Sequence, residues 1–182
     1  MNFSYKGKIL ISTPDISGDI FSRSVVLIIE HDENGAFGLI LNKKNTEIDP
    51  NLLNILDLPI EIFNGGPVEN DKIFIIVKGT PTNEFALKIN EQYYLTEDIL
   101  TILTELLENR LSISDIKLFS GYSGWSAQQL ESEISRKLWI PIEHYPLDYT
   151  LSHHQSLWKK MMENLGGQFL IWANTPEDVS MN

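Results

Sequence analysis

The sequence contains no cysteine, and this absence excludes several kinds of chemistry at once. Disulfide scaffolds, thiolate zinc sites, iron–sulfur clusters and cysteine nucleophiles all need a sulfur that the chain does not have. Long apolar runs are missing too. None approaches the length of a membrane-spanning helix, and Met1 to Lys8 lack the apolar stretch of a secretory signal. We therefore expect a cytoplasmic protein that does not enter a membrane.

Basic residues are scarce relative to acidic ones. The chain has 14 lysines and arginines against 25 aspartates and glutamates, which gives a formal net charge of −11. That field repels a polyanion such as DNA at long range. The densest basic clusters are only Arg136–Lys137 and Lys159–Lys160. Direct nucleic-acid binding is therefore disfavoured, and we expect a protein or a small molecule as the partner.

Motifs for metals and cofactors are also missing. The adjacent His153 and His154 would diverge by about 100° on a helix, so they do not form the i, i+4 pair that binds zinc. Gly65-Gly66-Pro67 lacks the lysine and hydroxyl of a P-loop and the glycine spacing of a dinucleotide-binding turn. The sequence predicts neither a metal site nor a bound cofactor.

What the chain does contain is enough for one domain. With 182 residues, 42% of them hydrophobic and 21% charged, it has the composition of a soluble globular domain with a sizeable core. No repeat or linker divides it, so we expect residues 1–182 to form a single domain with a loose tail at 174–182. Strands and helices are interspersed without a regular βαβ rhythm, which favours an α+β fold over a doubly wound one.

Strand patterns dominate the first half of the chain. Lys8–Ser12 and Ser24–His31 are expected to be strands, and the second contains the continuous apolar run Val25–Ile29, which suits burial on both faces. Asn34-Gly35 predicts a hairpin that returns Ala36–Leu41 antiparallel to it. A short helix is expected to begin at Asp49-Pro50. Further strands are expected at 61–64, 72–78, 85–89 and 92–95, the last two as a hairpin.

Helical spacing marks the second half. Ile99, Leu103, Leu106 and Leu107 recur on one face behind Thr96 and predict an amphipathic helix. The remaining expectations are a strand at 116–119, a helix opened by a capping box of Ser126 with Gln129 and running to Lys137, extended chain at 138–142, a last helix from Ser152 to Gly166, and a closing strand at 168–172.

Gly121-Tyr122-Ser123-Gly124-Trp125 lies between an expected strand and an expected helix, where hydrolases place a nucleophilic serine. The pattern fails, because the nucleophile elbow needs a glycine two residues after the serine and Trp125 stands there. The alternative is a tight strand-to-helix junction in which Trp125 is a buried anchor. We favour the junction.

Glu30 and His31 are adjacent, and a carboxylate beside an imidazole is a combination used in general acid/base catalysis. Neighbours on a strand point to opposite faces, however, so these two side chains are not expected to form a pair. We therefore expect His31 to hydrogen-bond within its hairpin. Arg23 is either an anion anchor or half of a surface ion pair with Asp15 or Asp19, and the ion pair is the plainer interpretation.

Three separated blocks of the sequence resemble the YqgE/AlgH family of bacterial proteins. The first runs from Gly7-Lys8-Ile9-Leu10-Ile11-Ser12-Thr13-Pro14 through Phe21-Ser22-Arg23-Ser24-Val25-Val26 and Glu30-His31 to Gly35-Ala36-Phe37-Gly38-Leu39-Ile40-Leu41-Asn42. The second is Gly65-Gly66-Pro67-Val68 with Asp71, and the third is Gly121 to Trp125 followed by Gln129-Leu130-Glu131 and Trp139. The chain departs from the family pattern at Lys44 and at Ala127-Gln128, where prolines or glycine are common.

The resemblance implies an α+β fold in which a bifurcated, largely antiparallel sheet curls into a pseudo-barrel with helices packed outside. It also implies a regulatory role, since the family is labelled a transcriptional regulator. It brings no catalytic residues to carry over onto this chain.

Two function hypotheses follow. The first is a non-enzymatic cytoplasmic regulatory or interaction protein; the alternative is a small-molecule-binding protein or enzyme that uses a pocket near Arg23, His31 and Trp125. Direct DNA binding is a third hypothesis, which the charge disfavours. A ligand or partner site is expected where the family blocks converge, unless these residues serve folding: Arg23, Glu30, His31, Asn42, Gly65, Gly66, Tyr122, Trp125 and Gln129.

Overall fold

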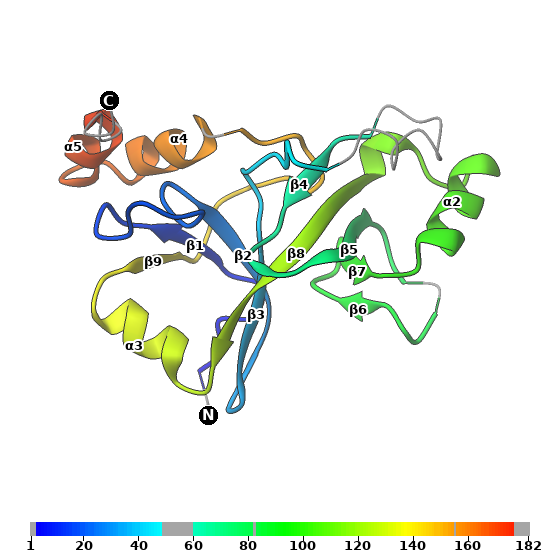
Figure 1. Cartoon of the computed structure of the whole chain (residues 1–182), viewed down its shortest axis with the longest axis horizontal. Coiled ribbons are helices and arrows are strands. Elements are labelled where there is room, and N and C mark those ends of the chain that lie inside the picture. Colours follow the sequence, from blue (N-terminus) through cyan, green and yellow to red (C-terminus); the bar gives the residue numbers. More distant parts are fainter. Residues whose placement is uncertain (1–2, 49–59, 82, 155, 177–182) are drawn as a thin grey trace.

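One curled sheet of nine strands forms the framework of the described residues, 3–48, 60–81, 83–154 and 156–176, in a computed structural model of the chain (Figure 1). Its strands are β1 (Ile9–Ser12), β2 (Val25–Asp32), β3 (Gly35–Ile40), β4 (Ile62–Asn64), β5 (Val68–Lys78), β6 (Leu87–Lys88), β7 (Tyr93–Thr96), β8 (Ile116–Ser126) and β9 (Trp139–Ile142). The strand order is β6-β7-β5-β8-β3-β2-β1-β9, and β4 pairs with β8 beside this path. Only the β4–β8 pair is parallel among the pairs of named strands. The expected α+β fold with a bifurcated, largely antiparallel sheet is confirmed.

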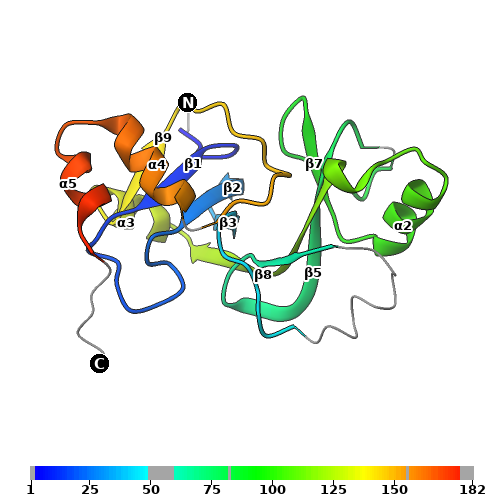
Figure 2. The same ribbon diagram turned by 90° about the horizontal axis from the view of Figure 1, so that it is seen from above.

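Helices cover both faces of the β1–β3 part of the sheet. The α-helices of the described residues are α2 (Ile99–Leu107), α3 (Gln129–Ser135), α4 (Ser156–Leu165) and α5 (Phe169–Asn174), and a short 3-10 helix, η1 (Ile113–Asp115), precedes β8. Helices α4 and α5 lie on one face and α3 on the other, while α2 lies at the far end of the molecule (Figures 1 and 2).

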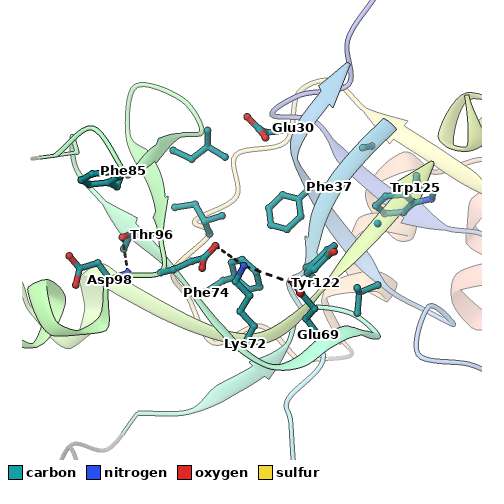
Figure 3. Close-up of a pocket in the computed structure, with 16 residues that line it drawn as sticks. Glu30, Phe37, Glu69, Lys72, Phe74, Phe85, Thr96, Asp98, Tyr122 and Trp125 are labelled. Atoms are coloured by element: carbon teal, nitrogen blue, oxygen red, sulfur yellow. Dashed lines mark hydrogen bonds and ion pairs between the residues drawn. The ribbon is translucent and has the colours of Figure 1, made fainter. Parts of the chain in front are cut away.

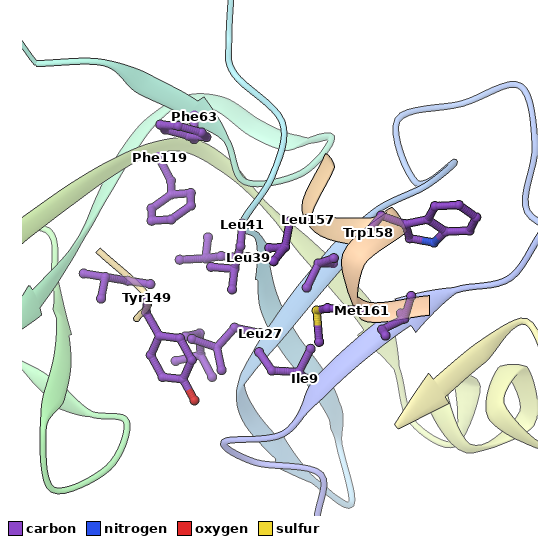
Figure 4. Close-up of a cluster of buried hydrophobic side chains, with 14 of the residues drawn as sticks. Ile9, Leu27, Leu39, Leu41, Phe63, Phe119, Tyr149, Leu157, Trp158 and Met161 are labelled. Atoms are coloured by element: carbon purple, nitrogen blue, oxygen red, sulfur yellow. The ribbon is translucent and has the colours of Figure 1, made fainter. Parts of the chain in front are cut away.

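Strand β2 shows why both faces can be covered. Val25, Leu27 and Ile29 point into the largest core, where Leu157, Trp158 and Met161 of α4 pack against the sheet (Figure 4). Val26 and Ile28 point the other way, into the core under α3. Because alternate residues of a strand face opposite sides, five apolar residues in succession predict this double burial, and the structure confirms it.

Strand β8 is the central element of the sheet. Ile116 and Leu118 belong to the core beneath α2, Phe119 to the core beneath α4, and Trp125 to the core beneath α3. Along one edge β8 pairs first with β4 and then with β3, and along its other edge with β5. The sheet divides at the point where β8 changes its neighbour from β4 to β3. Strand β8 therefore joins the two arms of the sheet, β6-β7-β5 on one side and β3-β2-β1-β9 on the other.

A close backbone contact occurs at the point of division. A Cβ on Gly66 would lie 2.2 Å from the carbonyl carbon of Tyr122, and one on Gly121 would lie 2.6 Å from the carbonyl oxygen of Gly66. Gly121 also has φ +67, in the left-handed region that side chains disfavour. Both glycines are therefore needed for the backbones to meet here.

Lys117 of β8 is a buried cation, and only 4% of it is exposed. Its ammonium donates to the carbonyl oxygens of Leu41 (2.6 Å) and Leu151 (2.7 Å) and lies 3.9 Å from the ring centroid of Phe63. Burial lowers the pKa of Lys117 to about 7, because removal from water penalises the charged form. The negative charge of Glu61 acts in the opposite direction and raises this pKa, but by less. This lysine ties the segment before α4 to the sheet.

Two predicted elements are wrong. Gly121–Trp125 is not a strand-to-helix junction but the second half of β8, which continues to Ser126 because β3 pairs with it there. The expected strand at 168–172 is instead helical: Gln168 is the N-cap of α5 and the following residues are in the helix. Gly166 and Gly167, which both have positive φ, turn the chain after α4. Helix α5 then packs Phe169, Trp172 and Ala173 against the same core as α4.

Several boundaries also shift. The hairpin loop is Glu33–Asn34, one residue earlier than expected, and Gly35 already belongs to β3. Helix α3 has Gln128 at its N-cap instead of Ser126. Helix α4 begins at Ser156, since the hydroxyl of Ser152 instead donates to Glu61 at 2.6 Å. The helix expected at Asp49-Pro50 and residues 177–182 of the expected tail lie outside the described residues, whereas Asn174 ends α5.

Substituting Gly121 by alanine should destabilise the fold more than the same change at Gly18. Both glycines have positive φ, but a Cβ at Gly18 would meet nothing within 4 Å. Gly18→Ala should therefore cost only about 1–2 kcal/mol for the left-handed backbone, and Gly121→Ala roughly 1–3 kcal/mol more for overpacking. Urea denaturation measures both, and equal losses would show that the contact with Gly66 is not tight.

Substituting Lys117 by methionine should remove a pH dependence of stability. The unfolded lysine keeps its proton up to about pH 10.5, whereas the folded one releases it near pH 7. The unfolded state binds more protons between these values, so the wild type should gain stability relative to Lys117→Met as pH rises, by at most about 1.4 kcal/mol per pH unit. Denaturation curves from neutral to alkaline pH test this, and parallel pH profiles would mean that the buried lysine keeps its ordinary pKa.

Candidate functional site

A hollow of about 1110 Å³ opens between the two arms of the divided sheet (Figure 3). One wall carries Glu30 of β2, Phe37 of β3 and Trp125 of β8. The opposite wall is formed by Phe85, Leu87 and Leu95, from the β6–β7 hairpin and the residues before it. Phe74 of β5 and Tyr122 of β8 lie between the walls. We call this site, defined by these residues, the aromatic hollow.

Three aromatic rings form its floor. The ring centroid of Phe37 lies 5.5 Å from that of Phe74 and 5.0 Å from that of Tyr122, and Phe74 and Tyr122 meet edge to face at 5.9 Å. These are distances of direct aromatic packing. All three rings are in or against the largest core. The apolar interior therefore reaches the surface in the aromatic hollow.

Two strand irregularities shape the charged rim. The register between β2 and β3 shifts between Ile28 and Glu30, which leaves Glu30 opposite Phe37. A larger shift on β5, between Val68 and Ile73, contains Glu69 and Lys72, and Glu69 has a positive φ of 48°. Bulges redirect side chains in this way beside functional sites. Here they bring charged groups to an otherwise apolar surface.

Lys72 is the cation of the rim, and carboxylates surround it. Its ammonium lies 3.2 Å from Glu97, 3.9 Å from Glu69 and 5.2 Å from the ring centroid of Phe74. The hydrogen bond to Glu97 raises the pKa of Lys72. Asp98 also lines the hollow, but its carboxylate caps α2 by accepting from the backbone N–H of Thr101. The carboxylate of Glu30 has neither a hydrogen bond nor an ion pair with any described residue.

Trp125 lines the hollow, but its indole packs into the core under α3, on the face of the sheet opposite the rings of Phe37 and Tyr122. It is 7% exposed, which confirms the expected burial. Its indole N–H donates to Oε2 of Glu133 at 2.8 Å, and the indole N–H of Trp139 donates to the same oxygen at 2.9 Å. Gln129 donates to the other oxygen of Glu133. Trp125 is therefore held as part of the core under α3.

The structure brings together three of the nine residues expected at a site. Glu30, Tyr122 and Trp125 line the aromatic hollow, whereas Arg23 and His31 are not among its lining residues. Of the three residues of the expected pocket near Arg23, His31 and Trp125, only Trp125 lines this hollow, so that pocket stays a prediction.

His31 and Arg23 instead hold segments of the chain in place. The ring of His31, whose side chain is 4% exposed, accepts from the backbone N–H of Tyr5 at 3.0 Å and contacts Glu131 at 2.8 Å. It does not bond within its own hairpin as expected, because its ring points toward α3. Arg23 donates to the carbonyl oxygen of Thr175 at 2.6 Å and lies over the ring of Trp158.

The other expected residues make contacts that belong to the fold. Asn42 is buried and bridges the backbone of Arg23 and Val25. The carbonyl of Gly65 accepts from the hydroxyl of Ser123, which is itself fully buried. Gln129 accepts from the backbone N–H of Ser126, so half of the expected capping box exists.

Sequence reasoning missed most of the aromatic hollow, including Phe37, Lys72, Phe74, Phe85 and Glu97. One signal was available: Phe85 sits in a short strand pattern beside a turn, where a large apolar residue has little core to join. The others come from β3, from β5 and from the residue after β7, and nothing in their spacing shows that they meet.

The described residues include no helix long and apolar enough to span a membrane, and no group of three or more histidine, aspartate or glutamate side chains placed to hold a metal ion. The described lining of the hollow contains neither histidine nor serine. What it offers is apolar surface and charge, which suit binding.

Comparisons with known proteins place the chain among relatives. A family model described as AlgH-like matches residues 9–170. A UPF0301 protein of Cytophaga hutchinsonii is 34% identical over 179 residues, covering 97% of this chain and 98% of the relative. A UPF0301 protein of Parabacteroides distasonis is 36% identical over 181 residues, covering 97% and 91%.

Solved structures share the fold. The solution structure of the AlgH protein from Pseudomonas aeruginosa matches with a TM-score of 0.72 at 24% identity, covering 97% of this chain and 96% of that one. The crystal structure of a Corynebacterium diphtheriae protein matches with a TM-score of 0.72 at 20% identity, covering 93% and 91%.

Trp125→Ala should cost roughly 3–5 kcal/mol of stability, because a large buried ring is removed and a cavity remains. Trp125→Phe should keep most of the stability, since it retains the apolar ring and loses only the bond to Glu133. Trp172→Ala on α5, where the ring is only half-buried, is a matched control that should lose less. Chemical denaturation measures all three. Unchanged stability of Trp125→Ala would show that the ring serves recognition alone.

Proposed function

This chain belongs to the AlgH-like family, and we propose that it acts as a non-enzymatic interaction protein whose aromatic hollow binds an apolar segment of a protein partner. The family resemblance expected from the three sequence blocks is thereby confirmed. The proposal specifies what a member with this surface does.

The observation that carries the proposal is the exposure of Phe85. This phenylalanine is 87% exposed and stands on the wall of a hollow whose floor is three packed rings. A lone exposed apolar residue needs no explanation, but one that extends a contiguous apolar surface marks an interaction site. The exposed ring widens the surface that a partner would cover.

The size of the hollow favours a polypeptide over a small molecule. Its volume of about 1110 Å³ slightly exceeds the upper end of the range typical of small-molecule pockets, roughly 300–1,000 Å³. Figure 3 shows Phe85 and Phe37 on opposite sides of the hollow. An extended segment with one or two large side chains fits such a site.

A regulatory role, including one in transcription, would be exerted through this protein partner. The net charge of −11 disfavours direct contact with DNA.

Phe85→Ala should weaken peptide binding without affecting the fold. Peptides are selected from a random displayed library against the purified chain, and the tightest is titrated by fluorescence anisotropy. Removal of an exposed anchoring ring should lower the affinity about tenfold or more, while stability changes by less than about 0.5 kcal/mol.

Leu107→Ala is the matched control, because Leu107 is 81% exposed on α2 and does not line the hollow. It should leave the affinity unchanged. Amide shifts in labelled protein should map the peptide to β3, β7 and the middle of β8. Peptide affinity that is unchanged in Phe85→Ala, or amide shifts that map the peptide away from the hollow, would overturn the proposal.

A further inference from the structure

We infer that the partner segment is basic: an arginine or lysine beside its apolar side chains takes the place of Lys72 between the carboxylates of Glu69 and Glu97. This inference rests on the proposed function and defines the chemistry of its partner.

Lys72 shows that the hollow has a position for a cation. Its ammonium group lies between two carboxylates, at 3.2 Å and 3.9 Å, and over the ring of Phe74 at 5.2 Å. Carboxylates and an aromatic face are the groups that bind ammonium and guanidinium ions together. The chain's own side chain thus occupies the position that a ligand's cation would take.

The remaining rim charges are negative. Glu30, Glu69, Glu97 and Asp98 are the acids among the described lining residues, against the one ammonium of Lys72. Glu30 stands beside Phe37 and has no partner among the described residues. A basic segment would complement this rim, whereas an acidic one would be repelled by it. The net charge of −11 adds steering in the same direction.

Lys72 can leave its place at low cost. Its side chain is 40% exposed, and those of Glu69 and Glu97 are 54% and 53% exposed. Exposed ion pairs of this kind are weak, and a lysine stem has many accessible rotamers. Guanidinium from a partner could instead bind a carboxylate through two parallel hydrogen bonds, which lysine cannot do. Arginine is therefore the stronger competitor.

The test uses three synthetic versions of one phenylalanine-rich peptide, which differ only in three flanking residues: arginines, glutamines or glutamates. Binding to the full chain is measured by fluorescence anisotropy at low and high salt. The arginine version should bind at least about tenfold more tightly than the glutamine version at low salt, and the difference should shrink as salt screens the rim. The glutamate version should bind most weakly.

Charge variants separate the rim from the net charge of the protein. Glu97→Gln should reduce the preference for arginine, whereas Glu91→Gln makes the same change in net charge outside the hollow, on a side chain that is 88% exposed, and should not. Lys72→Met should raise the affinity for the arginine peptide about three- to tenfold, because it removes the internal competitor and keeps an unbranched apolar side chain at this position. Lys88→Met is its control, since Lys88 pairs with Glu91 outside the hollow.

The outcomes separate this inference from the proposed function. Equal affinities for the arginine and glutamine peptides, both weakened by Phe85→Ala, would overturn the basic partner and leave the docking hollow standing. A Lys72→Met variant no better than Lys88→Met would show that Lys72 is not a competitor and would also overturn the inference. If Phe85→Ala changes the affinity for none of the peptides, both proposals fail.

Discussion

The fold depends on the close approach of two glycine-containing segments, Gly65–Gly66 and Gly121–Ser123. At this point β8 changes its neighbour along one edge from β4 to β3, and the backbones come too near for any Cβ on Gly66 or Gly121. The Ser123 hydroxyl then donates to the Gly65 carbonyl in the fully buried interior. Because β8 contributes residues to all three cores, a shift at this contact would reach every part of the molecule. The family motifs at these positions therefore meet a packing requirement of the fold.

The same division creates the aromatic hollow. After the sheet divides, the strands of one arm no longer lie over the concave side of the other arm. Apolar side chains near the point of division therefore have no second layer of structure above them. Phe37, Phe74 and Tyr122 bury part of their apolar surface by packing on one another. The bulges on β2 and β5 then add charge around them. The hollow that we propose as a binding surface thus lies where the folding constraint leaves the core open.

Much of the fold could be predicted from local patterns, but less of the site. Val25–Ile29 and Ile99–Leu107 were found because a strand buried on both faces and an amphipathic helix leave distinct periodicities. The segment 168–172 was misassigned because a short apolar run has no decisive period, and only its packing beside α4 makes it helical. Of the expected site residues, Glu30, Tyr122 and Trp125 line the hollow, since family blocks near the fork include its walls. Lys72 and Phe85 lie outside those blocks and meet the others only through sheet topology.

On the proposed function, one wall of the hollow serves stability and the other serves recognition. Trp125, 7% exposed and held by Glu133, belongs to a core that the fold needs in any case. Phe85, 87% exposed, lies on the arm that ends in the two-residue strand β6 and contributes little to that core. Substitutions on the Phe85 side can therefore alter what the hollow binds at small cost in stability, while those on the Trp125 side change both properties together. A surface arranged in this way can change partner preference during evolution while the divided sheet beneath it stays the same.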